Sequence, residues 1–402
     1  MKYKETKFGK IPWDWAVLPV KAVAEVVTDY VANGSFASLA KNVKYKETED
    51  VAILIRLVDY NNGFKNNFVY IDEHAYEFLA KSKLFGDEII ISNVGINVGT
   101  VFRCPHLKYK MSLGPNAIMV RFAGNNDFYY YWLKGFQGQQ MLRSIVTGSV
   151  QPKFNKTNFR DMLVPVPPIV IQNRIVTILN CLDRKIELNN KINENLEQQA
   201  TALFNNFYDQ AETEISFTDV IQILGGGTPK TGESGYWGGK IPFFTPKDVG
   251  SPYTLNTEKI ITEAGLARCN SRLYPINTVF VTARGTVGKV GMAGVPMAMN
   301  QSCYALVGKG IHQLLVYFYT LKVIDRLRHK ASGAVFDAVT TKDFESEHIM
   351  RLPDSIEKVF LCAAEPMYQA ILSNSIENQQ LAGLRDALLP KLISGEIDVS
   401  GI

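Results

Sequence analysis

The sequence has few cysteines and no long apolar run, and both absences exclude whole classes of protein. Five cysteines occur among 402 residues. They are odd in number, widely scattered and form no C-x-x-C pair, which argues against a disulfide framework or a structural zinc site. No window approaches the roughly 20 apolar residues of a membrane span, and the opening segment has no apolar run of signal-peptide length. We therefore expect a cytoplasmic protein with no membrane partner and no bound metal.

Signatures of catalysis and of nucleotide binding are also missing. The stretch TARGTVGKV (282–290) looks like a phosphate-binding loop, but Val290 stands where a P-loop needs Ser or Thr, and Ala283 stands at its first glycine. GGGTPK (225–230) breaks the G-x-G-x-x-G pattern, VPVPPIV lacks the flanking residues of a methyltransferase motif, and the five histidines are dispersed. We therefore expect a chain that is not an enzyme and holds no cofactor.

What the sequence does contain is an internal repeat. Residues 87–101, DEIIISNVGINVGTV, match residues 277–290, NTVFVTARGTVGKV, at an offset of about 190. The stretch SIVTGSVQPKFNKTNF (144–159) matches HKASGAVFDAVTTKDF (329–344) at an offset of 185, and that register continues without a gap. The chain is therefore a tandem duplication, and the Gly-rich stretch is one member of a pair rather than a single catalytic centre.

Both copies predict the same order of elements. A β-rich portion with Gly and Pro turns comes first, followed by an apolar helix (128–144 or 314–330), a proline punctuation and a long helical stretch. We expect a mixed α+β fold with pseudo-twofold architecture. Its β-rich domains would be residues 1–160 and 211–350, and its helical regions residues 161–210 and 351–402.

Both long helical stretches carry an a/d seam with Asn at the same two core positions. A buried Asn fixes register and partner because only the correct pairing satisfies its amide. We expect the two helices to pair with each other, and the alternative is that both seams are solvated faces of amphipathic helices. The seam positions are Leu182, Ile186, Asn189, Asn193, Leu196 and Leu203 in copy one and Met367, Ile371, Asn374, Asn378, Leu381 and Leu388 in copy two.

Prolines set the expected helix lengths. Pro366 and Pro390 would confine the second helix to 23 residues, or about 35 Å at 1.5 Å per residue, and the first helix (182–208) would span about 40 Å. Those lengths are close to one turn of B-DNA, the separation used by proteins that read two half-sites. An antiparallel pair would then act as a ruler between the β-rich domains.

The ordered set of motifs resembles the specificity (S) subunit of a type I restriction-modification system over essentially the whole chain. The motifs are GKIPWDWAVLPVKAV near the start, GGGTPKTGESGYWGGKIPFFTPKDV at the opening of copy two, the loops SNVGINVGTV and TARGTVGKV, the junction LVPVPPIVIQNRIVTILNCLDRKIELN and the ending LRDALLPKLISGEI. Each motif is weak alone, but the set occurs in order and twice.

That resemblance implies that the β-rich domains are target recognition domains, each reading one half of a bipartite double-stranded DNA sequence. The helical regions would form an antiparallel coiled coil and dock two methyltransferase (modification) subunits, with restriction translocase subunits in complexes that also cut. S-adenosylmethionine, ATP and magnesium would belong to those partners. One junction departs from the family pattern, because Gln172 and Ile175 of copy one become Glu357 and Phe360 in copy two.

Residues that read DNA must be polar or basic and must lie on loops that reach base edges or phosphates, and a net charge of +4 is compatible with this. The base-edge candidates are Asn93, Asn97, Ser112 and Asn116 in copy one and Arg284, Lys289, Asn300 and Gln301 in copy two. The phosphate candidates are Lys153, Lys156, Lys230, Lys247, Arg328, Lys330 and Lys342. The alternative for each is an ordinary solvated surface group.

Two other functions are compatible with parts of this pattern. A coiled-coil adaptor that binds only proteins would have no DNA affinity and no salt dependence. An enzyme acting alone would turn over substrate without partners, and the missing motifs argue against it. DNA binding that is salt-sensitive and requires a methyltransferase subunit would distinguish the specificity subunit from both.

Overall fold

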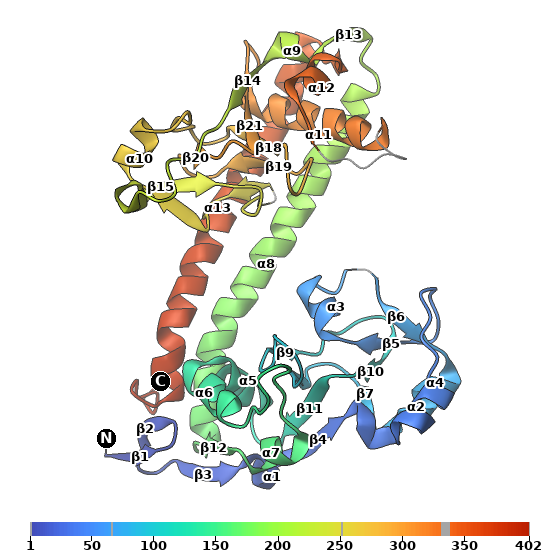
Figure 1. The fold of residues 1–402 in the computed structure, drawn as a ribbon, viewed down its shortest axis with the longest axis vertical. Helices are drawn as coiled ribbons and strands as arrows, with labels where there is room; N and C mark the ends of the chain where they lie inside the picture. The colour runs from blue at the N-terminus through green and yellow to red at the C-terminus, as the bar shows by residue number, and fades with distance from the viewer. Residues whose placement is uncertain (1, 66, 251, 331–337, 402) are drawn as a thin grey trace. The chain divides into compact units, whose positions relative to one another are not determined.

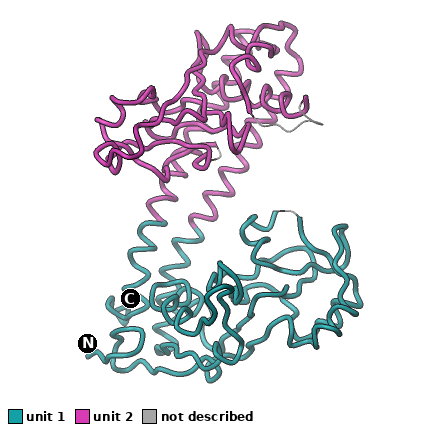
Figure 2. The backbone as a smooth tube through the Cα atoms, viewed as in Figure 1, with its two compact units in different colours: residues 1–184, 382–402 teal, residues 185–381 magenta. Residues whose placement is uncertain are grey.

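The computed structural model describes residues 2–65, 67–250, 252–330 and 338–401. The chain forms two compact units (Figure 2): unit 1 is residues 1–184 with 382–402, and unit 2 is residues 185–381. Both units mix helices and strands (Figure 1), so the α+β prediction is confirmed. The domain bounds drawn from the sequence stay a prediction, because the two units divide the long helices between them.

Unit 1 is built on two four-stranded sheets. Its strands are β1 (Tyr3–Thr6), β2 (Gly9–Pro12), β3 (Ala16–Pro19), β4 (Ala24–Asp29), β5 (Ala52–Ile55), β6 (Val69–Ile71), β7 (Lys83–Leu84), β8 (Ile89–Ser92), β9 (Val101–Arg103), β10 (Lys110–Leu113), β11 (Ala117–Phe122) and β12 (Leu163–Val166). Its shorter helices are α1 (Val20–Val23), η1 (Tyr30–Asn33), α2 (Phe36–Asn42), α3 (Leu57–Asn61), α4 (Glu73–Phe78), η2 (Ala80–Ser82), α5 (Asn126–Lys134), α6 (Phe136–Ser144) and α7 (Lys156–Asp161). The larger sheets have the orders β4-β11-β8-β9 and β6-β5-β10-β7.

Unit 2 has a similar plan, built on a five-stranded and a three-stranded sheet. Its strands are β13 (Thr213–Ser216), β14 (Ile221–Gly225), β15 (Trp237–Phe244), β16 (Tyr253–Thr254), β17 (Lys259–Ile261), β18 (Val279–Thr282), β19 (Val290–Ala293), β20 (Ala298–Met299), β21 (Cys303–Gly308) and β22 (His348–Arg351). Its shorter helices are α9 (Phe217–Val220), η3 (Ser234–Tyr236), α10 (Glu263–Ala267), α11 (Gln313–Lys330) and α12 (Thr341–Glu345).

Strand order confirms the tandem duplication. The order β14-β21-β18-β19 in unit 2 matches β4-β11-β8-β9 in unit 1. The parallel pair β5·β10 has its counterpart in the parallel pair β15·β20. The central strands β8 and β18 are short apolar runs buried along their whole length, so each repeat builds its core around the same element.

One expected helix is divided in unit 1. The apolar helix predicted for residues 128–144 is interrupted at Gly135, whose backbone is extended, giving α5 and α6. Its counterpart α11 is continuous. Gly138 shows how tight the turn is, because a Cβ there would lie 2.1 Å from the Trp132 carbonyl oxygen. The single-helix prediction was therefore wrong for copy one.

The two long helices have identical lengths, and they begin at positions separated by the offset of the repeat. Helix α8 covers Ile169–Tyr208 and helix α13 covers Asp354–Ile393, 40 residues each. The bounds predicted from Pro366 and Pro390 were wrong, and so were the shorter ruler lengths. Pro366 and Cys362, whose carbonyl the proline leaves free, are both exposed, so water can satisfy that carbonyl while the buried faces hold the helix together.

The pairing of the helices is confirmed by the predicted Asn layer, all of it inside unit 2. The Asn374 side-chain amide donates to Asn193 Oδ1 over 2.8 Å, and the Asn189 amide donates to Asn378 Oδ1 over 2.9 Å and to Glu377 Oε2 over 2.7 Å. Because a higher number on α8 pairs with a lower number on α13, the helices are antiparallel. Asn189 is fully buried, as a core seam position requires.

The hydrophobic seam positions of α8 and α13 pack as an a/d seam predicts. In unit 2, Leu196, Leu203 and Met367 pack against the main core cluster, and Ile371 lies within it. In unit 1, Leu388 packs against the core cluster, and Leu182 is half-buried. Ile186 and Leu381, both in unit 2, are likewise half-buried.

Candidate nucleic-acid interface

Each unit carries a Gly-rich loop built on the same backbone frame. Loop 1 (residues 93–100) joins β8 to β9, and loop 2 (residues 283–289) joins β18 to β19. In loop 1 the Gly99 N–H donates to the Ser92 carbonyl over 2.8 Å, and in loop 2 the Gly288 N–H donates to the Thr282 carbonyl over 2.8 Å. Both glycines have positive φ, 90° and 75°, which a residue with a Cβ adopts only with strain.

Two further backbone hydrogen bonds connect loop 1 to neighbouring segments of unit 1. The Asn93 N–H donates to the Asn116 carbonyl over 3.1 Å, and the Phe154 N–H donates to the Asn93 carbonyl over 3.1 Å. These bonds join loop 1 to the turn before β11 and to the segment before α7. Asn93, Asn116 and Lys153, which the sequence spreads over some 60 residues, therefore belong to one surface.

Loop 2 makes the equivalent bonds in unit 2. The Ala283 N–H donates to the Ser302 carbonyl over 2.8 Å, and the Val339 N–H donates to the Ala283 carbonyl over 3.0 Å. The Gln301 side chain, next to Ser302, accepts a hydrogen bond from the Thr228 hydroxyl. Arg284 and Gln301 are thereby brought to one surface.

A side chain from the helix that follows the sheet holds the second glycine of each loop. The Gln139 amide donates to the Gly99 carbonyl over 3.0 Å in unit 1. In unit 2 the Arg328 guanidinium donates to the Gly288 carbonyl over 2.6 Å. Arg328 is exposed and uses one guanidinium nitrogen for this bond, so its expected phosphate contact stays a prediction.

Among the unit 1 candidates, three reach the surface: Asn97, Asn116 and Lys153 are exposed. Ser112 does not, because it lies fully buried in β10 and donates to the Ser82 carbonyl over 3.1 Å. Lys156 is half-buried and its ammonium pairs with the partly buried Asp29 over 3.0 Å, so its expected phosphate contact stays a prediction.

Asn93 is half-buried and structurally engaged. Its side-chain amide donates to the Phe154 carbonyl over 3.0 Å. Its Oδ1 is buried and has no hydrogen-bond partner within the described residues.

The unit 2 candidates divide in the same way. Arg284, Lys289, Lys230 and Lys342 are exposed. Lys247 is exposed and lies 3.9 Å from Glu258, an ion pair that water screens strongly.

Two unit 2 candidates make side-chain contacts with other residues of the chain. The Asn300 Oδ1 accepts the Ser302 N–H over 3.0 Å and so shapes the turn, and its expected base contact stays a prediction. Lys330 is exposed and pairs with the buried carboxylate of Glu347, so its expected phosphate contact stays a prediction.

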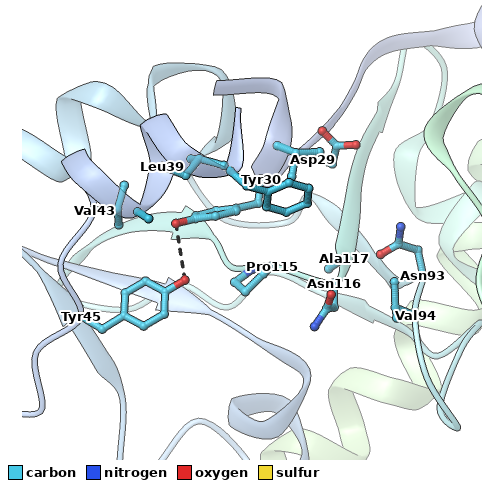
Figure 3. A pocket seen from close by; sticks show the side chains of 13 residues that line it. Asp29, Tyr30, Leu39, Val43, Tyr45, Asn93, Val94, Pro115, Asn116 and Ala117 are labelled. Atoms are coloured by element: carbon cyan, nitrogen blue, oxygen red, sulfur yellow. Dashed lines mark hydrogen bonds between the residues drawn. The ribbon is translucent and has the colours of Figure 1, made fainter. Parts of the chain in front are cut away.

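Sequence reasoning missed a pocket beside loop 1 (Figure 3). This pocket, which we call the aromatic pocket, has a volume of about 510 Å³. Tyr30, Phe36 and Tyr45 line it together with Asn93 and Asn116. The three aromatic residues follow no periodic pattern, so no signal in the sequence could have identified them as a group.

Burial changes the pKa of a tyrosine hydroxyl in the aromatic pocket. Desolvation, followed by the hydrogen bond from Tyr45, raises the pKa of the Tyr30 hydroxyl well above 10. The two phenol oxygens lie 3.4 Å apart. Tyr30 therefore stays neutral at physiological pH.

In the part of the chain that the structure describes, no group of three or more His, Cys, Asp or Glu side chains is placed to hold a metal ion. Over the same residues, no helix is both long and apolar enough to cross a membrane.

Comparison with known proteins gives consistent matches. The family model described as "Type I restriction modification DNA specificity domain" matches residues 12–198 and 212–360. The chain is similar to the MjaIX specificity subunit of Methanocaldococcus jannaschii, with 24% identity over 99% of this chain and 97% of the relative. It is similar to the EcoR124I/EcoR124II specificity subunit of Escherichia coli, with 23% identity over 76% of this chain and 74% of the relative.

Among solved structures, the fold is similar to that of the S subunit of a type I restriction-modification system from M. genitalium. The TM-score is 0.59 at 13% identity, over 94% of this chain and 96% of that one.

Proposed function

The chain belongs to the family of type I restriction-modification DNA specificity proteins, and we propose that it selects the DNA sequence on which such a complex acts. Unit 1 reads one half of a bipartite target and unit 2 reads the other. The observation that carries this proposal is the pair of loops on one backbone frame. A shared frame presents a loop in the same way twice, while different side chains on it give each unit its own specificity.

The side chains differ where the frame does not. Asn93 of loop 1 has Ala283 as its counterpart in loop 2, and the residue after Ala283 is the exposed Arg284. Arg bonds both acceptors of guanine in the major groove, and Asn bonds adenine. We assign base-edge contacts to Asn97 and Asn116 in unit 1 and to Arg284, Lys289 and Gln301 in unit 2. We assign phosphate contacts to Lys153, Lys230, Lys247 and Lys342.

The partners and the chemistry follow from this assignment. Helices α8 and α13 dock two methyltransferase subunits and, in complexes that cut, restriction translocase subunits. Methyl transfer from S-adenosylmethionine and ATP- and magnesium-dependent work belong to those subunits. This chain contributes recognition and no catalytic group.

The test is to co-express the chain with a candidate type I methyltransferase subunit, purify the complex, and map methylated bases in the host genome by long-read sequencing. We expect a split motif with two short specified halves and a fixed unspecified gap. DNA binding by the complex should weaken steeply with salt. A continuous methylated motif, or a stable complex without salt-sensitive DNA binding, would favour the protein-only adaptor instead.

A further inference from the structure

The aromatic pocket has the size and surface of a site for a flat ring. Its volume of about 510 Å³ lies within the ~300–1,000 Å³ typical of small-molecule sites. Phe36 is 81% exposed and Tyr45 is 54% exposed, although both are large aromatic side chains. Exposed rings beside a cavity are stacking surfaces, and stacking on aromatic side chains is how proteins hold single bases.

Asn93 lines the pocket, and among the residues that the structure describes its Oδ1 has no hydrogen-bond partner. The Asn93 amide nitrogen is bound to the Phe154 carbonyl, so the orientation of the side chain is fixed and Oδ1 is left as the free acceptor. Figure 3 shows this oxygen turned toward the side of the pocket that holds Ala117 and Asn116. A buried acceptor without a donor is costly, and a ligand that supplies an N–H group removes that cost.

Charge in the pocket does not oppose nucleic acid. Asp29 lines the pocket, but its carboxylate pairs with Lys156 over 3.0 Å. The tyrosine hydroxyl of Tyr30 stays neutral. The remaining lining is apolar, including Leu39 and Val43.

The pocket also lies beside the loop to which the proposed function assigns DNA contacts. Asn93 and Val94 of loop 1 and Asn116 of the adjoining turn line it, so it opens beside the base-edge candidates of unit 1. We propose that the aromatic pocket receives one base displaced from the DNA duplex, adenine or cytosine, whose exocyclic amino group donates to Asn93 Oδ1. This inference rests on the proposed function and adds a mode of readout to it.

The corresponding place in unit 2 has no room for a side chain at the position of Tyr30. Gly226 directly follows β14, as Tyr30 follows β4, and a Cβ on Gly226 would lie 2.1 Å from the Asn300 carbonyl oxygen. Ala283 replaces Asn93, so the side-chain acceptor of unit 1 is missing at this position. The displaced base therefore belongs to the half-site of unit 1, and the half-site of unit 2 is the internal comparison.

The experiment scans single mismatches through both half-sites of the mapped target, using the full chain in complex with its methyltransferase subunit. A mismatch normally weakens specific binding. At the displaced position it should strengthen binding about tenfold, because the base is already unpaired and extrusion costs less. The half-site whose readout changes in Arg284→Ala is assigned to unit 2, which identifies the other as that of unit 1.

Pocket variants then test the site itself. Phe36→Ala and Tyr45→Ala should weaken binding of the intact target about tenfold, while Phe85→Ala, at another exposed aromatic of unit 1, should not. Ala40→Trp fills the pocket from an exposed position and should abolish the gain from the mismatch.

The outcomes separate the two proposals. Split-site binding in which every unit 1 mismatch weakens the complex, or a gain that survives Phe36→Ala and Ala40→Trp, overturns the pocket and leaves the specificity function intact. Absence of sequence-specific DNA binding by the complex overturns both.

Discussion

Arg328 donates a hydrogen bond to the Gly288 carbonyl over 2.6 Å, and the same contact is made in the other repeat by Gln139 to Gly99 over 3.0 Å. At the offset of 185, Gln139 aligns with Ile324, one helical turn before Arg328. Residues at non-equivalent positions therefore donate hydrogen bonds to the equivalent loop carbonyls of the two repeats. Such a contact fixes where the loop places its side chains without touching DNA.

The loop contact of Arg328 predicts a loss of specificity without a loss of charge contacts. Arg328→Ala should reduce discrimination at the unit 2 half-site about tenfold while leaving the slope of log affinity against log salt unchanged. Lys342→Ala is the matched control, because removal of an exposed phosphate contact should weaken all sequences alike and lower that slope by about one. Filter binding at several salt concentrations measures both. A reduced slope for Arg328→Ala would show that this residue also contacts a phosphate.

Arg284 should read a base directly. Arg284→Ala should relax specificity at one position of the unit 2 half-site, costing about 1–3 kcal/mol for the preferred base. Methylation mapping of the variant complex detects the degenerate position, and the unit 1 half-site serves as the internal control. An unchanged motif would mean that Arg284 is an ordinary surface charge.

The Asn layer of unit 2 should be coupled. Asn374→Leu leaves Asn193 Oδ1 without its donor and should lower the free energy of unfolding by about 1–3 kcal/mol. The double variant Asn193→Leu/Asn374→Leu should lose less than the sum of the single changes, because neither polar group remains. Urea unfolding of both single variants and the double variant gives the coupling energy, with the exposed Asn195→Ala as control. Additive losses would contradict a direct contact.

Exchanging Glu and Gln at the junctions after Pro168 and Pro353 should change the Tm at pH 7 in opposite directions. Burial raises the pKa of the Glu357 carboxyl above 4.5, so the folded protein holds this proton more tightly than the unfolded chain. The resulting destabilisation is complete above the raised pKa and disappears as the pH falls toward 4.5. Glu357→Gln should therefore raise the Tm at pH 7, with an advantage that shrinks on acidification.

The reverse change in copy one is the matched test. The Gln172 amide donates to the Pro167 carbonyl over 2.9 Å, and its Oε1 accepts the Asn125 N–H over 3.0 Å. Gln172→Glu replaces the donor with a carboxylate and should lower the Tm at pH 7. Scanning calorimetry across pH 4.5–8 measures both variants, and equal effects at every pH would exclude the ionisation argument.

Ser112 should affect stability and not recognition. Ser112→Ala removes a buried hydroxyl that donates to the Ser82 carbonyl and should cost about 1 kcal/mol of unfolding free energy. The methylated motif should stay unchanged, whereas Asn116→Ala should alter the unit 1 half-site. A changed motif in Ser112→Ala would contradict its placement inside β10.

The sequence by itself determined the duplication, the α+β class and the pairing of the helices. Each of these is recorded locally: Gly-rich stretches recur at a fixed offset, and Asn189 and Asn193 take the same seam positions as Asn374 and Asn378. Periodicity and repetition are properties of the chain itself, so they can be read without coordinates.

The tertiary structure decided which polar residues are free to act. Ser112 and Arg328 lie in segments that look like surface by composition, yet one is buried and the other is bound to a loop carbonyl. The same holds for Pro366 of α13, because packing along the buried faces outweighs the local cost of a proline on an exposed face. Tyr30, Phe36 and Tyr45 meet at one pocket only because η1, α2 and loop 1 fold together. Burial and partnership depend on contacts between distant segments, and those contacts leave no local pattern in the sequence.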